Sequence, residues 1–181
     1  KTPMVFMTYA NVLFSYGAER FIAKSAELGI DGFILPDIPF EEKEEFLPVC
    51  RRYGVELISL IAPTSKDRIA MIAREAEGFL YVVSSLGVTG ARSEIKTGVR
   101  SEITTDIGAM VQIIRENTDV PCAVGFGIST PEQAKKMSEA ADGVIVGSAI
   151  VKLAAQYGRD AVQPIGAYVR SMKEAIGGKI R

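Results

Sequence analysis

The sequence predicts an α/β fold built on a parallel β-sheet, and three observations support this. Short apolar, β-branched runs recur along the 181 residues at intervals of roughly 20 to 28 residues, with one longer gap. Each run is apolar throughout, which is typical of parallel strands covered on both faces. The stretches between the runs carry apolar residues at helical spacing. Strands and helices that alternate at this interval favour βαβ units in a parallel sheet.

The elements follow in order from these patterns. We expect six strands: Met4–Thr8, Gly32–Pro36, Glu56–Ala62, Phe79–Ser84, Cys122–Phe126 and Gly143–Val146. Two apolar helix faces are clear: Ile107, Met110, Val111 and Ile114, and then Val162, Ile165, Val169, Met172 and Ile176. Thr130 predicts a helix start, because Pro131 at the first helical position and Gln133 at the third complete a capping box. Six such units fit either a doubly wound sheet or part of a barrel, and the period does not distinguish the two.

Composition limits the classes of function. With 48% hydrophobic residues, the chain can bury one substantial core, and we expect a single domain over residues 1–181. A net charge of −1 without a basic stripe argues against nucleic acid or a membrane as partner. The chain has no histidine, which excludes Ser-His-Asp triads and histidine-based metal sites, and we expect no metal. Two isolated cysteines, Cys50 and Cys122, fit a reducing cytoplasm.

One long segment lacks a recognisable period. From Ser85 to Thr105 run about twenty residues that include three glycines and several charges. Loops of this length are uncommon in compact domains and often serve as lids. We expect a lid here, and a tolerated surface insertion is the alternative.

The clearest chemical signal lies in the last two units. One strand ends in Gly125–Ser129 and the next in Gly147–Lys152. Glycines at the carboxyl end of a strand let backbone N–H groups approach a phosphate, and Ser148 would lie at a helix N-terminus, which favours an anion. In (β/α)8 barrels the phosphate site uses the loops after the last two strands, so the pair favours a TIM barrel with a phosphate ligand. One alternative is that these are ordinary turn glycines. A Rossmann dinucleotide-binding fingerprint fits poorly, because the segment that begins at Gly125 lacks the third glycine of that motif.

Other polar residues follow the predicted strands. They are Tyr9 and Asn11, Asp37, Tyr81 and Ser84, and Thr89 with Gly90. In a barrel, such residues at the carboxyl ends of strands face the active site. The alternative interpretation of Asp37, in Pro-Asp-x-Pro, is a turn or helix-cap residue, and that of Tyr81 is a core residue.

Six ordered motifs together resemble the α subunit of tryptophan synthase. They are Met7–Asn11, Pro36–Pro39, Ala62–Thr64, Ser84–Gly90, Gly125–Ser129 and Gly147–Lys152. The resemblance implies a lyase of tryptophan biosynthesis that cleaves indole-3-glycerol phosphate to indole and glyceraldehyde 3-phosphate. It implies no metal or organic cofactor in this subunit, because PLP belongs to a partner β subunit in an αββα complex.

The same resemblance implies roles for individual residues. The phosphate-binding residues are Gly90, Gly127, Gly147 and Ser148, with Phe126 lining the pocket. Tyr81 would assist beside the reacting indole, and Thr89 would be the key hydroxyl of the lid. The residues that contact the β subunit are Tyr9, Asn11, Asp37 and Pro39. Two positions depart from the family: Ser85, where it often has arginine, and Phe79, a milder change.

The resemblance begins at the family's third strand, so about six of the eight units of a barrel are represented. The family's acid and base, a glutamate and an aspartate before that point, have no counterpart among these residues. We therefore expect the 181 residues as printed to be inactive, since each such group contributes about 10²–10⁴-fold. The sequence either omits residues of a longer protein, or is a fragment, or is a shortened module. Alternative functions are a non-catalytic module that docks a β subunit and another sugar-phosphate barrel enzyme; a strand-swapped dimer is a further hypothesis.

Overall fold

The computed structural model describes residues 2–83, 99–125 and 127–177, with only the backbone described for residues 99–106. The strands are β1 (Val5–Met7), β2 (Gly32–Ile34), β3 (Glu56–Ile61), β4 (Leu80–Val83), β5 (Cys122–Gly125) and β6 (Gly143–Val144). The α-helices are α1 (Ala10–Tyr16), α2 (Ala18–Glu27), α3 (Leu47–Tyr53), α4 (Lys66–Arg74), α5 (Val99–Asn117), α6 (Pro131–Ser138), α7 (Ser148–Tyr157) and α8 (Val162–Ala175). Two 3-10 helices, η1 (Phe40–Glu45) and η2 (Gly158–Asp160), precede α3 and α8. All six predicted strands are confirmed in order.

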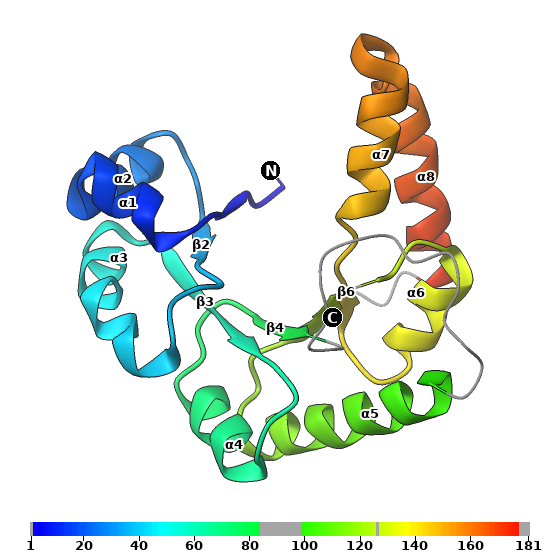
Figure 1. Ribbon diagram of the computed structural model, residues 1–181, viewed down its shortest axis with the longest axis horizontal. Helices are drawn as coiled ribbons and strands as arrows, with labels where there is room; N and C mark the ends of the chain where they lie inside the picture. The colour runs from blue at the N-terminus through cyan, green and yellow to red at the C-terminus, as the bar shows by residue number, and fades with distance from the viewer. Residues whose placement is uncertain (1, 84–98, 126, 178–181) are drawn as a thin grey trace.

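The sheet has the strand order of a barrel. Its described strands lie in the order β1-β2-β3-β4-β5-β6, and every neighbouring pair is parallel. A doubly wound sheet would reverse its order at a switch point. The first half of β3, Glu56–Ile58, pairs with β2, whereas Ser59–Ile61 pairs with β4, a stagger expected of tilted barrel strands. The result is a curled half-barrel with α1 to α6 on its outer side, as Figure 1 shows.

Successive strand residues point to opposite faces of the sheet, and this alternation separates the cores. On the outer side, Leu80, Val82 and Val124 pack against α4 and α5 in one large apolar cluster. That cluster also contains the predicted face of α5: Ile107, Met110, Val111 and Ile114. A second outer cluster joins β2 to α1, α2 and α3 around Phe33. The concave side carries its own small cluster of Ile34, Ile58 and Tyr81.

The helix ends follow the local sequence. Thr130 caps α6 as predicted, because its hydroxyl accepts from the Gln133 N–H at 3.3 Å while the Gln133 side chain accepts from the Thr130 N–H at 3.2 Å. Ser65 caps α4 by accepting from the Arg68 N–H at 3.3 Å. Gly54 ends α3 in the left-handed conformation, with φ of 66°, which glycine adopts at no steric cost.

Two predictions about the helices were wrong in part. Helix α5 begins at Val99, six residues before the expected start near Thr105, because its first turns are polar and hide the apolar period. On the predicted apolar face of α8 only Met172 is buried, whereas Val162 is 78% and Val169 43% exposed. The physical reason is that α8 packs against α6 and α7 and does not lie flat on the sheet.

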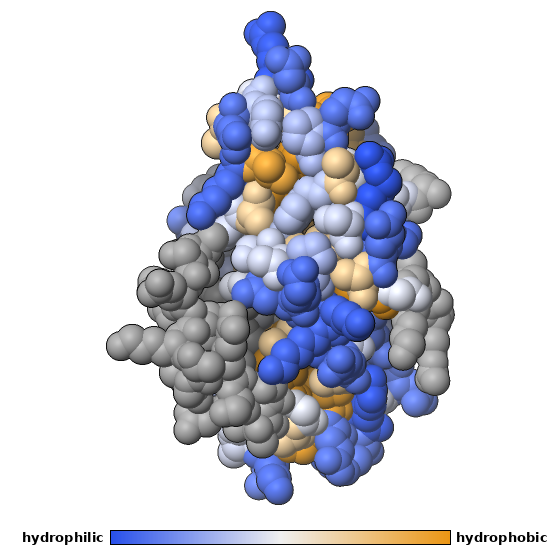
Figure 2. Space-filling model, turned by 90° about the vertical axis from the view of Figure 1, so that its right-hand side faces the viewer, coloured by the Kyte–Doolittle hydropathy of each residue, from blue (hydrophilic) through white to orange (hydrophobic). Residues whose placement is uncertain are grey.

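The α7–α8 pair extends away from the sheet in Figure 1, and Figure 2 shows apolar surface (orange) among charged side chains (blue) on that side of the molecule. None of the residues of α7 is buried. In the described parts of the chain, no helix combines the length and the apolar content that a membrane span needs.

Candidate active site

Two glycine-containing loops leave the same edge of the sheet. The β5 loop (residues 127–130) follows β5 and the β6 turn (residues 145–147) follows β6, and these strands are parallel neighbours. A Cβ atom placed on Gly127 or Gly147 would meet no heavy atom of the described residues within 4 Å. Both glycines therefore border open space, where a ligand can reach the backbone.

Helix α7 presents its N-terminus to this edge. Its N-cap residue, Gly147, provides no side chain, and no side chain among the described residues caps the helix. The Gly147 carbonyl accepts from the N–H groups of Ile150 and Val151, at 2.9 and 3.1 Å. The amides of the first turn have no partner within the helix, and with the helix dipole they favour an anion. Ser148 begins α7 and is exposed, so its predicted place at a helix N-terminus is confirmed.

Hydrogen bonds hold the β5 loop from two sides. The N–H of Ser129 donates to Oε1 of Gln133 at 2.8 Å, and the hydroxyl of Tyr168 in α8 donates to the Ser129 carbonyl at 3.0 Å. Gly127 adopts φ of 77°, which lets the chain turn directly after β5. No pattern in the sequence pointed to Tyr168, and the one available signal is a tyrosine on a helix whose other large apolar residues are aliphatic.

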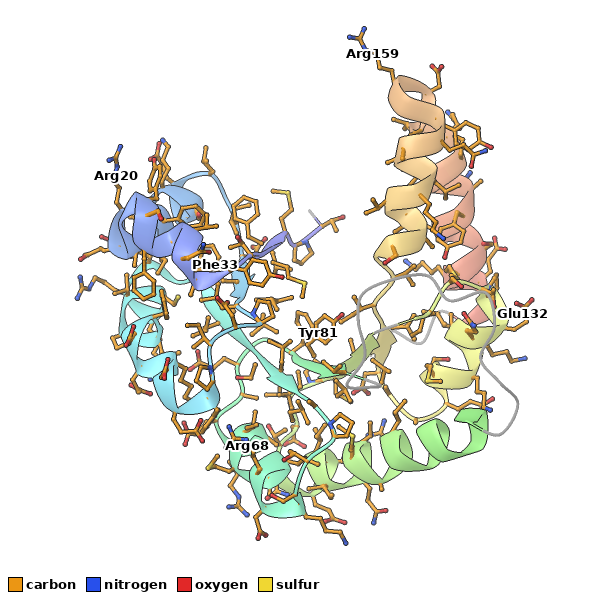
Figure 3. All side chains as sticks on the ribbon, in the orientation of Figure 1. Arg20, Phe33, Arg68, Tyr81, Glu132 and Arg159 are labelled. Atoms are coloured by element: carbon orange, nitrogen blue, oxygen red, sulfur yellow. The ribbon has the colours of Figure 1, made fainter. Side chains whose placement is uncertain are left out.

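Tyr81 lies on the concave side of the sheet. Figure 3 shows its side chain near the centre of the molecule, on the face opposite α4 and α5. The residue is only 6% exposed, and its ring lies against the backbone of Gly125 in the neighbouring strand. A Cβ at Gly125 would lie 2.5 Å from Cε1 and 2.6 Å from Cζ of Tyr81, so this position must be glycine for the ring to fit. Burial raises the pKa of the Tyr81 phenol, which therefore stays neutral and able to donate a hydrogen bond at neutral pH.

The predicted partner residues gather at the carboxyl ends of β1 and β2. Both carboxylate oxygens of Asp37 accept from the Ala10 N–H at 3.1 Å, so Asp37 caps α1 from a neighbouring loop. This confirms the cap interpretation of Asp37. Tyr9 is 62% exposed, and Asn11 and Pro39 are exposed as well. The four residues thus form one accessible surface around the start of α1.

A cavity of about 370 Å³ lies beside this surface, lined among others by Phe40, Lys43 and Arg68. Both of its cations are already paired. Lys43 pairs with Glu75, and Arg68 donates to both carboxylate oxygens of Glu41 at 2.6 and 3.0 Å. The Arg68 guanidinium holds the pKa of Glu41 at about 2. The cavity therefore offers no unneutralised charge for a phosphate.

The remaining predicted site residues, Phe126, Thr89, Gly90, Ser84 and Ser85, lie outside the described residues, and their roles stay predictions. Among the residues that the structure describes, no group of three or more His, Cys, Asp or Glu side chains could hold a metal ion.

Comparison with known proteins identifies relatives for nearly the whole chain. The family model "Tryptophan synthase alpha chain" matches residues 1–177. A tryptophan synthase alpha chain of Lacticaseibacillus casei is 44% identical over 98% of this chain and 64% of its own length. One of Lactiplantibacillus plantarum is 47% identical, also over 98% of this chain and 64% of its own length.

Solved structures agree with these relatives. The tryptophan synthase subunit alpha of Campylobacter jejuni superposes with a TM-score of 0.82 at 37% identity, over 95% of this chain and 65% of that one. The tryptophan synthase subunit alpha of Legionella pneumophila superposes with a TM-score of 0.79 at 35% identity, over 98% of this chain and 63% of that one. This chain spans about 64% of the length of the curated relatives it matches. By motif order, sheet order and these similarities, it belongs to the tryptophan synthase alpha chain family.

Proposed function

We propose that this chain is part of a cytoplasmic tryptophan synthase α subunit and binds indole-3-glycerol phosphate for cleavage to indole and glyceraldehyde 3-phosphate. One observation carries the proposal: two glycine-containing loops at the carboxyl ends of β5 and β6, one of them leading into the uncapped N-terminus of α7. Backbone amides and a helix dipole at this place in a parallel barrel suit a phosphate monoester. The proposal includes no metal or organic cofactor in this chain.

The reaction breaks the bond between indole C3 and the adjacent glycerol carbon. The hydroxyl on that carbon loses its proton and becomes the aldehyde, while C3 gains a proton. With the phosphate at Gly127, Gly147 and Ser148, the indole would extend over the concave face of the sheet. There Tyr81, held neutral by burial, can contact the ring and donate a hydrogen bond.

The described loops that follow the strands contain a single carboxylate, Asp37, and this group is bound to the Ala10 N–H. We therefore propose that the described residues supply phosphate binding and the Tyr81 contact but neither the general acid nor the general base. A polypeptide of these 181 residues should bind phosphate and release no indole from indole-3-glycerol phosphate. Indole release at an enzymatic rate would contradict this part of the proposal.

The phosphate site can be tested with one methyl group. Gly147 has a φ of −113°, and a Cβ there meets no atom of the described residues within 4 Å, so Gly147→Ala should leave the fold intact while placing a methyl group in the proposed phosphate space. We expect inorganic phosphate to bind about tenfold more weakly or worse, a loss of ~1.4 kcal/mol. Gly108→Ala in α5 is the matched control, because its Cβ also meets nothing within 4 Å.

Amide chemical shifts measured during phosphate titration provide the readout. Phosphate should shift the amides of Gly127, Gly147 and Ser148 in the unsubstituted chain and in Gly108→Ala. If Gly147→Ala bound phosphate as tightly as Gly108→Ala, the proposed site would be rejected. A non-indole sugar phosphate that binds more tightly than an indole-bearing phosphate monoester would favour another sugar-phosphate barrel enzyme.

We further propose that the surface of Tyr9, Asn11, Asp37 and Pro39 contacts a tryptophan synthase β subunit. The exposure of all four residues at one end of the barrel favours this role. Tyr9→Ser should weaken co-elution with a β subunit, whereas Tyr157→Ser, an exposed tyrosine on α7, should not. Loss of binding in both variants, or in neither, would count against the surface. Binding without catalysis in the longer protein would favour the docking module.

A further inference from the structure

The peptide groups on both sides of Ser129 are fixed by hydrogen bonds. The Gln133 Oε1 atom accepts from the Ser129 N–H at 2.8 Å, from the Ser129 hydroxyl at 3.3 Å and from the Thr130 N–H at 3.2 Å. On the other side, the Ser129 carbonyl accepts from the Tyr168 hydroxyl at 3.0 Å. The β5 loop is therefore held between α6, which it enters, and α8, whose Tyr168 lies 39 positions after Ser129.

Tyr168 connects the two halves of the candidate phosphate site. The β5 loop contributes Gly127, whereas Gly147 and Ser148 lead into α7, which continues through η2 into α8. In the described part of the chain, the Tyr168 hydroxyl makes the only side-chain hydrogen bond between α8 and the β5 loop. This bond thus ties the loop to the helix pair that carries the other half.

The side chain is suited to a fixed position. Its ring packs in the apolar cluster of Ile128, Met172 and Ile176, while the hydroxyl reaches the Ser129 carbonyl. Burial raises the pKa of the Tyr168 phenol, so the group stays protonated at neutral pH. A protonated phenol donates, and a carbonyl can only accept, so the direction of this bond is settled.

We propose that Tyr168 is a positioning residue for phosphate binding, which fixes the spacing between the Gly127 loop and the Gly147–Ser148 turn without touching the ligand. The proposal rests on the phosphate site proposed above. The oxygens of a phosphate have a fixed geometry. A phosphate bound by backbone amides from two loops therefore needs the two loops to be held at a fixed distance from each other. Loss of the Tyr168 bond would let the β5 loop move and would raise the cost of binding.

Tyr168→Phe tests this directly, because phenylalanine keeps the ring in its cluster and removes only the hydroxyl. We expect inorganic phosphate and glycerol 3-phosphate to bind about 2–10-fold more weakly, by the same factor for both, as expected for the loss of one hydrogen bond. In the free variant, the amide signals of the β5 loop should shift and broaden, whereas those of β1 to β3 should stay unchanged. A purely structural role would lower the unfolding temperature without this local signature.

Tyr157→Phe is the matched control, since it removes a phenol hydroxyl from an exposed position on α7. Its phosphate affinity should equal that of the unsubstituted chain. Equal affinity in Tyr168→Phe and the unsubstituted chain would overturn the inference while the phosphate site stands, as would an equal loss in both variants. Failure of phosphate to bind the unsubstituted chain would overturn the phosphate site and, with it, the role of Tyr168.

Discussion

The contact between Tyr81 and Gly125 predicts the effect of a single methyl group. In Gly125→Ala the new Cβ would lie 2.5 Å from Cε1 of the ring, whereas ordinary contacts begin at 3.4 Å, so the ring or the strand must move by about 0.9 Å. Tyr81 is buried against Ile34 and Ile58 and has little room to do so. Overpacking of this kind costs about 1–3 kcal/mol. For a chain of this size, each kcal/mol lowers the unfolding temperature by about 2–4 °C.

A double-mutant cycle isolates this contact. Urea unfolding would give the free energy of unfolding for the unsubstituted chain, Gly125→Ala, Tyr81→Leu and the double variant. Because leucine removes the ring atoms that the methyl group meets, adding Gly125→Ala to Tyr81→Leu should cost less than ~0.5 kcal/mol, the range of independent sites. A cost for Gly125→Ala that is the same with tyrosine and with leucine would refute the reasoning, since the ring would then not be the obstacle.

Three further predictions concern single groups. Asp37→Ala removes the cap of α1 and should lower the free energy of unfolding by about 0.5–2 kcal/mol in urea, whereas Asp37→Asn, which keeps an acceptor, should lose less. Burial, with a smaller effect of nearby Glu77, raises the pKa of the Cys50 thiol to about 11, so iodoacetamide should modify it at mildly alkaline pH only after unfolding; fast modification of the folded chain would contradict this. The ion pair with Arg68 lowers the pKa of Glu41 from 4.5 to about 2. The contribution of this pair to the stability of the fold is therefore complete above pH 4.5 and is lost as the pH falls towards 2. When the free energy of unfolding is followed as the pH falls, Glu41→Gln should lack this part of the decrease. High salt should reduce the difference between Glu41→Gln and the unsubstituted chain, because the ion pair is exposed.

Much of the fold followed from the sequence because burial dictates the pattern. Strands covered on both faces are mostly apolar, and β3 and β4 are covered by α4 and α5 outside and by the concave cluster inside. The same logic identified the buried face of α5. It failed for α8, since an apolar pattern shows which residues share a face but not which element covers that face. Val162 and Val169 belong to such a face and remain exposed.

The candidate site was predictable where it depends on backbone and not where it depends on distant contacts. The glycines after β5 and β6 and the place of Ser148 follow from strand order and local conformation. The Tyr168–Ser129 and Asp37–Ala10 hydrogen bonds join positions 39 and 27 residues apart. Such pairs depend on how the units curl around each other, which no local pattern encodes. The space that Gly125 leaves for Tyr81 is of the same kind, because it arises across two strands.

The consecutive order of the strands has a consequence for how the chain folds. Each strand pairs with the one before it, so every pairing closes a loop of a single βαβ unit. The entropy cost of closure grows only with the logarithm of loop length, about 0.6 kcal/mol for each doubling. The connection from β4 to β5 is about twice as long as that from β5 to β6, and this difference hardly delays its pairing. The sheet can therefore grow outward from any adjacent pair of strands, and the length of the β4–β5 connection can change in evolution at little cost to the barrel.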